Sequence, residues 1–219
     1  MSALRVKICG VTTTTDAVLA ADLGADAIGL NFYPKSPRFV PPVTGEVIVR
    51  VLPPFVEPVA LFVNEPLETA FAAARQLGRV RTVQWHGEQP EVCTDPNFRF
   101  IPAFQVRDAD DLARVRHYLA LCEQVGHPPA AVLIDGQVSG RYGGTGQLAP
   151  WKLLAEFRPE VPLILAGGLT PENVAEAVRL VRPYGVDVAS GVEETPRRKD
   201  PEKILRFIDA AREAAARLT

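Results

Sequence analysis

The stretch Arg5-Val6-Lys7-Ile8-Cys9-Gly10-Val11, close to the N-terminus, predicts a short strand that ends in a turn. Val6 and Ile8 are β-branched residues that favour a strand, and Gly10 releases the backbone before a run of threonines that opens a helix. Because strand side chains alternate between two faces, Lys7 and Cys9 point the same way. An ammonium and a thiol side by side at a strand end serve either packing or chemistry.

Outward from this stretch, short apolar strand patterns alternate with helical patterns to the end of the chain. Seven more strands are expected at residues 27–32, 59–63, 81–85, 100–104, 131–134, 161–166 and 185–189. Apolar residues spaced i, i+3, i+4 and i+7 predict helices between most of them, the first stopping at Gly24 and the last entered at Asp200-Pro201. The segment 87–97 is short and broken by proline, so we expect a degenerate helix after strand four or five.

Eight strand–helix units predict an α/β fold, a (β/α)8 TIM barrel that forms one domain over residues 1–219. A doubly wound parallel sheet is the alternative. The count of eight strands, and the lack of a GxGxxG sequence after the first of them, favour the barrel.

Composition restricts the kind of function. The chain has 219 residues, 47% of them hydrophobic, and a net charge of −2, which gives no basic surface for nucleic acid and favours small-molecule partners. Its three cysteines, Cys9, Cys93 and Cys122, show no CxxC or Cys/His spacing, which argues against a disulfide framework and a zinc site. We find no signal peptide or membrane span, and expect a cytoplasmic protein.

In a barrel of this kind, functional residues lie at the C-terminal ends of the strands. Two proton-transfer candidates lie there, Cys9 and Asp135. Cys9 alone would more often be a small buried hydrophobe, but the cation of Lys7 favours a thiolate. Asp135 ends an apolar strand, where packing does not explain a carboxylate; a helix cap or loop anchor is the alternative.

Two glycine turns follow neighbouring strands, Gly167-Gly168 and Ser190-Gly191. Backbone N–H groups at such turns bind phosphate, and the loops after strands seven and eight are the usual phosphate site of this fold. Thr170 is expected to cap the following helix, with Pro171 as its first residue. Ordinary turn glycines are the alternative to a phosphate site.

Other candidates are less specific. The glycine-rich segment 140–146, which contains Gly144, predicts a mobile loop over a substrate. Arg38 pairs with an anionic or planar substrate group, or is a surface arginine. His86 is an active-site donor or a structural histidine. For Asp187 the alternative to a functional role is an anchor of the barrel floor through hydrogen bonds.

Together these motifs resemble phosphoribosylanthranilate isomerase of tryptophan biosynthesis. The resemblance runs in the order of that family from residue 5 to 203, and its pieces are Lys7-Ile8-Cys9-Gly10, Gly24-Ala25-Asp26, Ser36-Pro37-Arg38, Phe62-Val63-Asn64, Gln84-Trp85-His86-Gly87, Asp135, residues 143–146, residues 165–169 and residues 185–193. Trp85 departs from the leucine that is usual in the family.

The resemblance implies an Amadori rearrangement of N-(5-phosphoribosyl)anthranilate to 1-(2-carboxyphenylamino)-1-deoxyribulose 5-phosphate. It implies that Asp135 is the general acid that opens the furanose ring and that Cys9 is the general base that removes the C2′ proton. Arg38 would contact the anthranilate, and Gly167, Gly168, Ser190 and Gly191 would hold the phosphate. We expect Lys7, His86, Gly144 and Asp187 to be further substrate contacts.

The resemblance implies no metal or organic cofactor, and a monomer or a homodimer. Two other readings stay open. Another phosphosugar barrel, such as an epimerase or an indole-forming synthase, would want clustered metal ligands or a catalytic lysine elsewhere. A non-catalytic barrel that binds a phosphorylated ligand would keep the glycine turns and lose Cys9 or Asp135, yet both are present.

Overall fold

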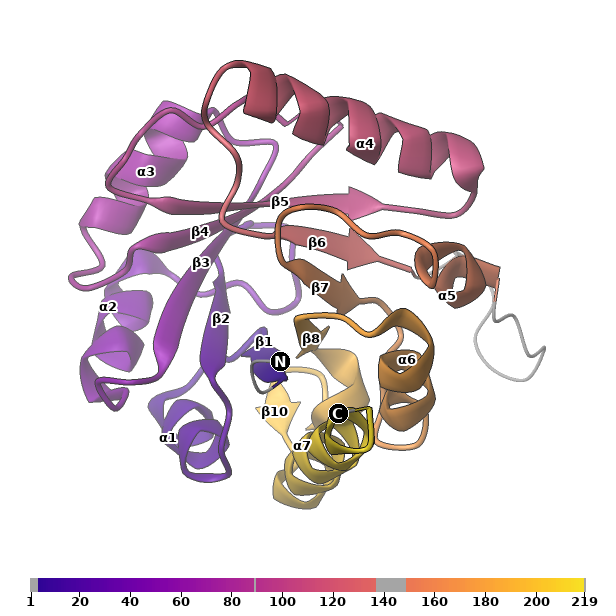
Figure 1. Ribbon diagram of the computed structural model, residues 1–219. Helices are drawn as coiled ribbons and strands as arrows, with labels where there is room; N and C mark the ends of the chain where they lie inside the picture. Colours follow the sequence, from indigo (N-terminus) through magenta and orange to yellow (C-terminus); the bar gives the residue numbers. More distant parts are fainter. Residues whose placement is uncertain (1–3, 89, 137–148, 219) are drawn as a thin grey trace.

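The computed structural model describes residues 4–88, 90–136 and 149–218. Eight parallel strands follow one another around a closed barrel, and β1 pairs with both β2 and β8 (Figure 1). The strands are β1 (Arg5–Cys9), β2 (Ala27–Asn31), β3 (Glu57–Val63), β4 (Thr82–His86), β5 (Arg99–Gln105), β6 (Val132–Asp135), β7 (Leu163–Ala166) and β8 (Gly185–Val188). The predicted (β/α)8 barrel is confirmed.

Helices surround the barrel, as Figure 1 shows, and return the chain from the end of one strand to the start of the next. They are α1 (Thr14–Asp22), α2 (Pro42–Val51), α3 (Leu67–Arg75), α4 (Ala109–Gln124), α5 (Ala149–Leu154), α6 (Val174–Val181) and α7 (Pro201–Ala216). Between β4 and β5 the described residues contain no helix. The degenerate position is therefore the one after strand four, whereas strand five is followed by the 16-residue α4.

Two helix ends follow the sequence signals. Gly24, just after α1, has a φ of +101°, a left-handed conformation that favours glycine. At the start of α7 the carboxylate of Asp200 accepts hydrogen bonds from the N–H groups of Glu202 and Lys203, and Pro201 is the first residue.

The predicted start of α6 is wrong. The helix begins at Val174, and its N-cap is Asn173 rather than Thr170. The Thr170 hydroxyl accepts from the N–H of Glu172 at 3.3 Å, while the Asn173 side chain accepts from the N–H of Thr170 at 2.8 Å. These bonds hold a turn that leads into the helix, because the N–H of Val174 also donates to the carbonyl of Thr170 at 3.0 Å. The threonine–proline pair therefore marks this turn and not the first helical residue.

Strand alternation divides the buried side chains into two cores. Outward-facing residues such as Val6 and Ile8 pack against the helices, where they join the main hydrophobic cluster. A smaller cluster lies inside the barrel and is formed by Ile101, Ala103, Ala131, Leu133 and Ala166. These residues come from β5, from the residue before β6, from β6 itself and from β7. Polar side chains, among them Lys7 and Asp187, are buried elsewhere in the interior.

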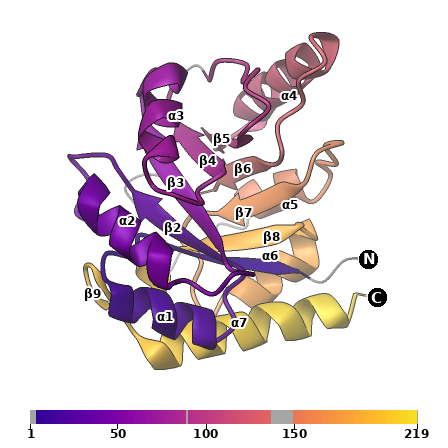
Figure 2. The same ribbon diagram turned by 90° about the vertical axis from the view of Figure 1, so that its left-hand side faces the viewer.

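After β8 the chain adds a short 3-10 turn, η1 (Ser190–Val192), and a two-stranded antiparallel hairpin, β9 (Glu193–Thr195) with β10 (Arg198–Lys199). The chain then enters α7, which brings the C-terminus close to the N-terminus (Figure 2). In the described part of the chain, no helix combines the length and apolarity needed to span a membrane.

We expect Phe207→Ala to lower the free energy of unfolding by about 3–5 kcal/mol, because it empties a large site in a close-packed core. Phe207 lies on α7 and is 0% exposed. Urea unfolding followed by circular dichroism measures the change. Leu205→Ala on the same helix is the control, because Leu205 is 44% exposed and its loss should change stability by about 0.5 kcal/mol or less. Equal effects of the two substitutions would contradict this packing.

Candidate active site

Cys9 and Lys7 lie side by side inside the barrel, as the strand alternation predicts. Cys9 is the last residue of β1 and stands in register with Gly29 of β2. A Cβ built on Gly29 would lie 2.8 Å from Cys9 Sγ and 2.9 Å from Lys7 Nζ. Both side chains therefore lean over the bare Cα of Gly29, which provides the room that brings the thiol and the ammonium together.

Lys7 is paired with Asp187. The two residues stand in register on β1 and β8, and Lys7 Nζ donates a 2.8 Å hydrogen bond to Asp187 Oδ1. Burial opposes the charge on Lys7, but Asp187 and Cys9 outweigh it and raise the pKa of the ammonium. Asp187 therefore partners the cation that lies next to Cys9.

Arg38 belongs to a second charged group. Its Nε and Nη2 donate to the two carboxylate oxygens of Glu193 at 2.7 and 2.5 Å, a bidentate pair. Lys199 Nζ, fully buried, lies 3.2 Å from Glu193 Oε1 and donates to the carbonyl of Ala189 at 2.9 Å. A Cβ built on Gly10 would lie 2.3 Å from Arg38 Cδ, so the arginine side chain crosses the turn directly after Cys9. Two cations thus share one carboxylate.

The thiol of Cys9 is influenced by both groups. Burial raises the pKa of Cys9, and this effect exceeds the lowering by Lys7; Asp187 raises the pKa further, while Lys199 lowers it. Lys7 acts in the predicted direction, toward the thiolate, but burial keeps the pKa of the thiol raised overall. The uncompensated positive charge beside Cys9 comes from the group of Arg38, Glu193 and Lys199.

His86 ends β4 and its Nε2 lies 2.7 Å from Nε2 of Gln84. Burial and the charge of Lys7 lower the pKa of His86 to about 4, so the imidazole is neutral at pH 7.

Trp85, between Gln84 and His86 in the sequence, faces outward and donates to the carbonyl of Glu65 at 2.7 Å. Its ring leaves no room for a side chain at Gly87, since a Cβ there would lie 2.1 Å from the indole.

Asp135 is the last residue of β6, in register with Gln105 and Ala166, and is half-buried. Strands of a parallel barrel end on one face, so Asp135 and Cys9 lie at the same mouth, on strands six and one. Gly144, predicted to contact the substrate, lies outside the described residues.

The two glycine turns are adjacent. Gly191 packs directly on the turn after β7, because a Cβ built on it would lie 1.9 Å from the carbonyl oxygen of Leu169. Gly167 and Gly168 have φ values of +90° and +64°, which favour glycine, and no described atom lies within 4 Å of a Cβ built on Gly168. Gly167, Gly168, Ser190 and Gly191 thus form one surface beside the mouth, with space above Gly168.

Sequence reasoning assigned no role to four residues of this region: Gln84, Gly29, Glu193 and Lys199. Gln84 could have been found, because it shares a strand face with His86 by its two-residue spacing and is polar in an apolar strand. Glu193 and Lys199 left no such signal. They reach Arg38 only through the hairpin that follows β8, and Glu193 lies 155 residues from Arg38 in the sequence.

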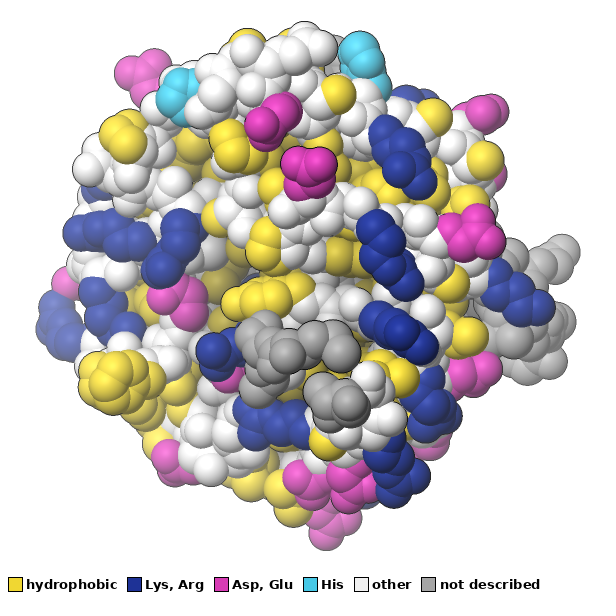
Figure 3. All heavy atoms as spheres, in the orientation of Figure 1, with side chains coloured by type: hydrophobic (Ala, Val, Ile, Leu, Met, Phe, Trp, Pro, Cys, Tyr) yellow, Lys and Arg dark blue, Asp and Glu magenta, His cyan; other side chains and the backbone are white. Residues whose placement is uncertain are grey.

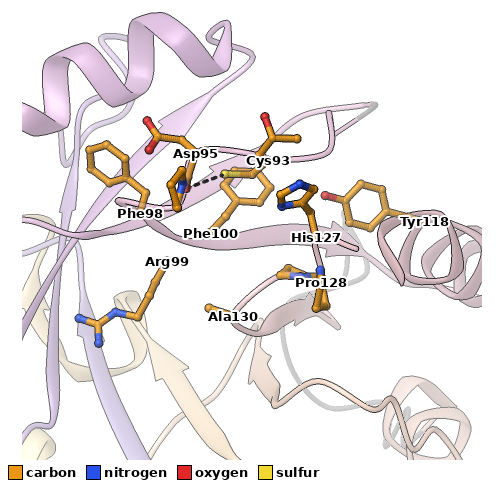
Figure 4. Close-up of a pocket in the computed structure, with 12 residues that line it drawn as sticks. Cys93, Asp95, Phe98, Arg99, Phe100, Tyr118, His127, Pro128 and Ala130 are labelled. Carbon is orange, nitrogen blue, oxygen red and sulfur yellow. Dashed lines mark hydrogen bonds between the residues drawn. The ribbon is translucent and has the colours of Figure 1, made fainter. Parts of the chain in front are cut away.

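A separate cavity of about 200 Å3 lies at the N-terminal ends of β5 and β6, away from the mouth of the barrel (Figure 4). Cys93, Tyr118 and His127 line it, and Cys93 Sγ lies 4.0 Å from the carbonyl of Asp95. Burial raises the pKa of Cys93 and no described cation lowers it, so this thiol lacks the cationic setting of Cys9. The described residues hold no cluster of three or more His, Cys, Asp or Glu side chains placed to bind a metal. On the face seen in Figure 3, basic side chains are interspersed with acidic and hydrophobic ones.

Comparison with known proteins relates the chain to one family. Residues 6–210 match the family model described as N-(5'phosphoribosyl)anthranilate (PRA) isomerase. The N-(5'-phosphoribosyl)anthranilate isomerase of Geotalea daltonii is 46% identical over 210 residues, which are 95% of this chain and 97% of the relative.

Solved structures agree with this relation. One contains monomers generated from the dimeric phosphoribosylanthranilate isomerase of Thermotoga maritima; it is 36% identical, with a TM-score of 0.81, over 96% of this chain and 99% of that chain. Another is a phosphoribosylanthranilate isomerase in complex with reduced 1-(o-carboxyphenylamino)-1-deoxyribulose 5-phosphate. It is 37% identical, with a TM-score of 0.81, over the same shares of the two chains.

We expect Lys199→Met to raise the apparent pKa of Cys9, because it removes a buried cation that favours the thiolate. The rate of Cys9 alkylation by iodoacetamide against pH, followed by mass spectrometry of the Cys9 peptide, measures the shift. Arg198→Met is the matched control on the same strand, because Arg198 is exposed and pairs with Glu194. A profile for Lys199→Met that overlays the control would show that Lys199 does not influence the thiol.

Proposed function

Since this chain belongs to the N-(5'-phosphoribosyl)anthranilate isomerase family and catalyses the Amadori rearrangement of tryptophan biosynthesis, we propose that Cys9 is its general base and Asp135 its general acid. The observation that carries the assignment is their position at the ends of β1 and β6, at one mouth of the barrel. A substrate that lies across the mouth has one group on either side.

The proposed sequence of steps uses these two groups alone for proton transfer. Asp135 in its acid form gives a proton to the furanose ring oxygen, and the ring opens to a Schiff base. Cys9 as thiolate then removes the C2′ proton, and the resulting enolamine tautomerises to the aminoketone. A base must be deprotonated to act. Lys7 and, to a smaller extent, Lys199 of the Arg38–Glu193–Lys199 group lower the pKa of Cys9 against the effect of burial.

The phosphate of the substrate is proposed to bind the surface formed by Gly167, Gly168, Ser190 and Gly191. Backbone N–H groups suit an anion there, and the space above Gly168 leaves room for it. Arg38 is proposed to meet the anthranilate carboxylate. A guanidinium has five N–H donors, and the bonds to Glu193 use two of them.

Other predicted contacts belong to the same mouth. Lys7 and Asp187 are proposed to contribute as a pair, because their mutual bond leaves the ammonium further N–H donors for the substrate. His86 is proposed to offer a neutral imidazole, and Gly144 remains a predicted contact. Neither proton transfer in this scheme requires a metal or an organic cofactor.

We expect Cys9→Ala and Asp135→Asn each to lower kcat by at least about 1,000-fold, because each removes one proton-transfer group and leaves the phosphate and anthranilate contacts in place. The assay follows the change in anthranilate fluorescence when the substrate is added. Cys93→Ala, in the distant cavity, is the control for loss of a thiol. Turnover within a few-fold of the parent enzyme in either variant would refute the role of that residue.

We also propose that the protein forms a homodimer through the N-terminal face of the barrel. Phe55, between α2 and β3, is 98% exposed, and it borders a cavity of about 390 Å3 whose walls include Val59, Ile101 and Ile164. An exposed phenylalanine beside an apolar cavity on one face supports a self-complementary contact with a second copy. The enzyme of Thermotoga maritima is described as dimeric, which supports a homodimer.

We also propose a domain organisation and a cellular compartment. Residues 1–219 are proposed to form one domain, since β1 and β8, from the two ends of the chain, pair within one barrel. The cytoplasm is the proposed compartment, and the free thiols of the three cysteines are compatible with its reducing conditions.

We expect Phe55→Asp to convert the dimer to a monomer without loss of kcat, because it places a charge in the apolar contact and lies on the face opposite the mouth. Size-exclusion chromatography with light scattering gives the mass. Val43→Asp is the control, because Val43 is 72% exposed on α2 and does not line the cavity. A parent protein with the mass of one chain, or a dimer that survives the Phe55 substitution, would contradict this interface.

A further inference from the structure

Gln84 carries an unpaired polar atom inside the barrel. The residue is 1% exposed and lies in the middle of β4, where its side chain shares the inner face with Thr82 and His86. Within the described residues, its Oε1 is the one buried side-chain nitrogen or oxygen that lacks a hydrogen-bond partner. Such an atom loses its hydration on folding and gains nothing in return.

Stability does not explain a glutamine at this place. Its neighbours in register are Leu61 on β3 and Ile101 on β5, both apolar and buried. A methionine of similar length and volume would fit the same space without an unpaired oxygen. A polar residue that costs stability, and lies two residues below the mouth, points to a functional reason.

The amide nitrogen of Gln84 indicates this functional reason. Gln84 Nε2 lies 2.7 Å from His86 Nε2. In this orientation of the amide, its nitrogen donates and does not accept, so the imidazole Nε2 is the acceptor in this bond. A neutral ring that accepts at Nε2 carries its proton on Nδ1, and Nδ1–H is then its hydrogen-bond donor.

We propose that Gln84 is a positioning residue for the isomerase reaction: it holds His86 as the neutral Nδ1–H tautomer, which presents a hydrogen-bond donor to the phosphosugar substrate. This inference rests on the proposed contact between His86 and the substrate. The charged groups that face His86 are Lys7 on β1 and Asp187 on β8. Burial and Lys7 keep the ring uncharged. The tautomer, and not an ionic charge, therefore determines which hydrogen-bonding group the imidazole presents to the substrate.

The first test is nitrogen-15 NMR of the histidine ring. The chain has only three histidines, so His86 can be assigned by comparison with His86→Ala. We expect a protonated Nδ1 and an unprotonated Nε2 at pH 7 in the parent protein, and a shift toward Nε2–H in Gln84→Met. A parent ring protonated on Nε2, or a ring whose tautomer does not change in the variant, would overturn the proposal.

The second test separates positioning from a structural role. We expect Gln84→Met to lower kcat/KM about tenfold while its melting temperature equals or exceeds that of the parent, because the unpaired oxygen is gone. In the His86→Ala background the same substitution should cause no further loss, since Gln84 acts through His86. Thr82→Val, on the same inner face of β4, is the matched control and should leave kcat/KM unchanged.

Unchanged kcat/KM in Gln84→Met, or an equal loss with and without His86, would overturn the proposal. Failure of the proposed function gives a different result. If Cys9→Ala and Asp135→Asn stayed active, the proton-transfer roles would be wrong, whereas the tautomer measured by NMR and its dependence on Gln84 would be unaffected.

Discussion

The parallel pairing of β1 with β8 is the contact on which the rest of the structure depends. It closes the barrel and sets Lys7 opposite Asp187, so that an ammonium and a carboxylate meet at 2.8 Å in the interior. A buried ammonium is costly unless a partner compensates it. A slip of one residue would turn Asp187 to the outer face and leave Lys7 alone, so the ion pair specifies the register of closure. Cys9, two residues beyond Lys7, takes its position from the same register.

Around this pair, apolar and polar side chains occupy different parts of the barrel interior. The apolar cluster of β5, β6 and β7 fills one part of it, and Lys7, Cys9 and Asp187 of β1 and β8 form a polar side. The polar side lies below the mouth where Arg38 and Lys199 share Glu193, which leaves a positive excess. A substrate with a phosphate and a carboxylate suits such a mouth, because opposite charge favours its approach and its orientation.

Much of this could be predicted from the sequence, because the responsible signals are local. Apolar alternation located all eight strands, and the same alternation put Lys7 and Cys9 on one face. What could not be predicted depends on distant contacts. The direction of the Cys9 pKa shift follows from burial by the whole fold, and Arg38 meets Glu193 only through the hairpin after β8. The start of α6 was misjudged because Thr170 and Asn173 form a turn that leads into the helix.

The closing contact also bears on synthesis of the chain, which proceeds from the N-terminus. Lys7 is made 180 residues before Asp187, and Glu193 and Lys199 follow Asp187 in the chain. Until these residues are made, the ammonium has no carboxylate, Arg38 lacks Glu193, and the edge of β1 has no neighbour to replace β8. Closure of the barrel is therefore unfavourable in the nascent chain until these residues are present. Completion of the barrel, and with it the chemistry of Cys9, becomes a late event in folding.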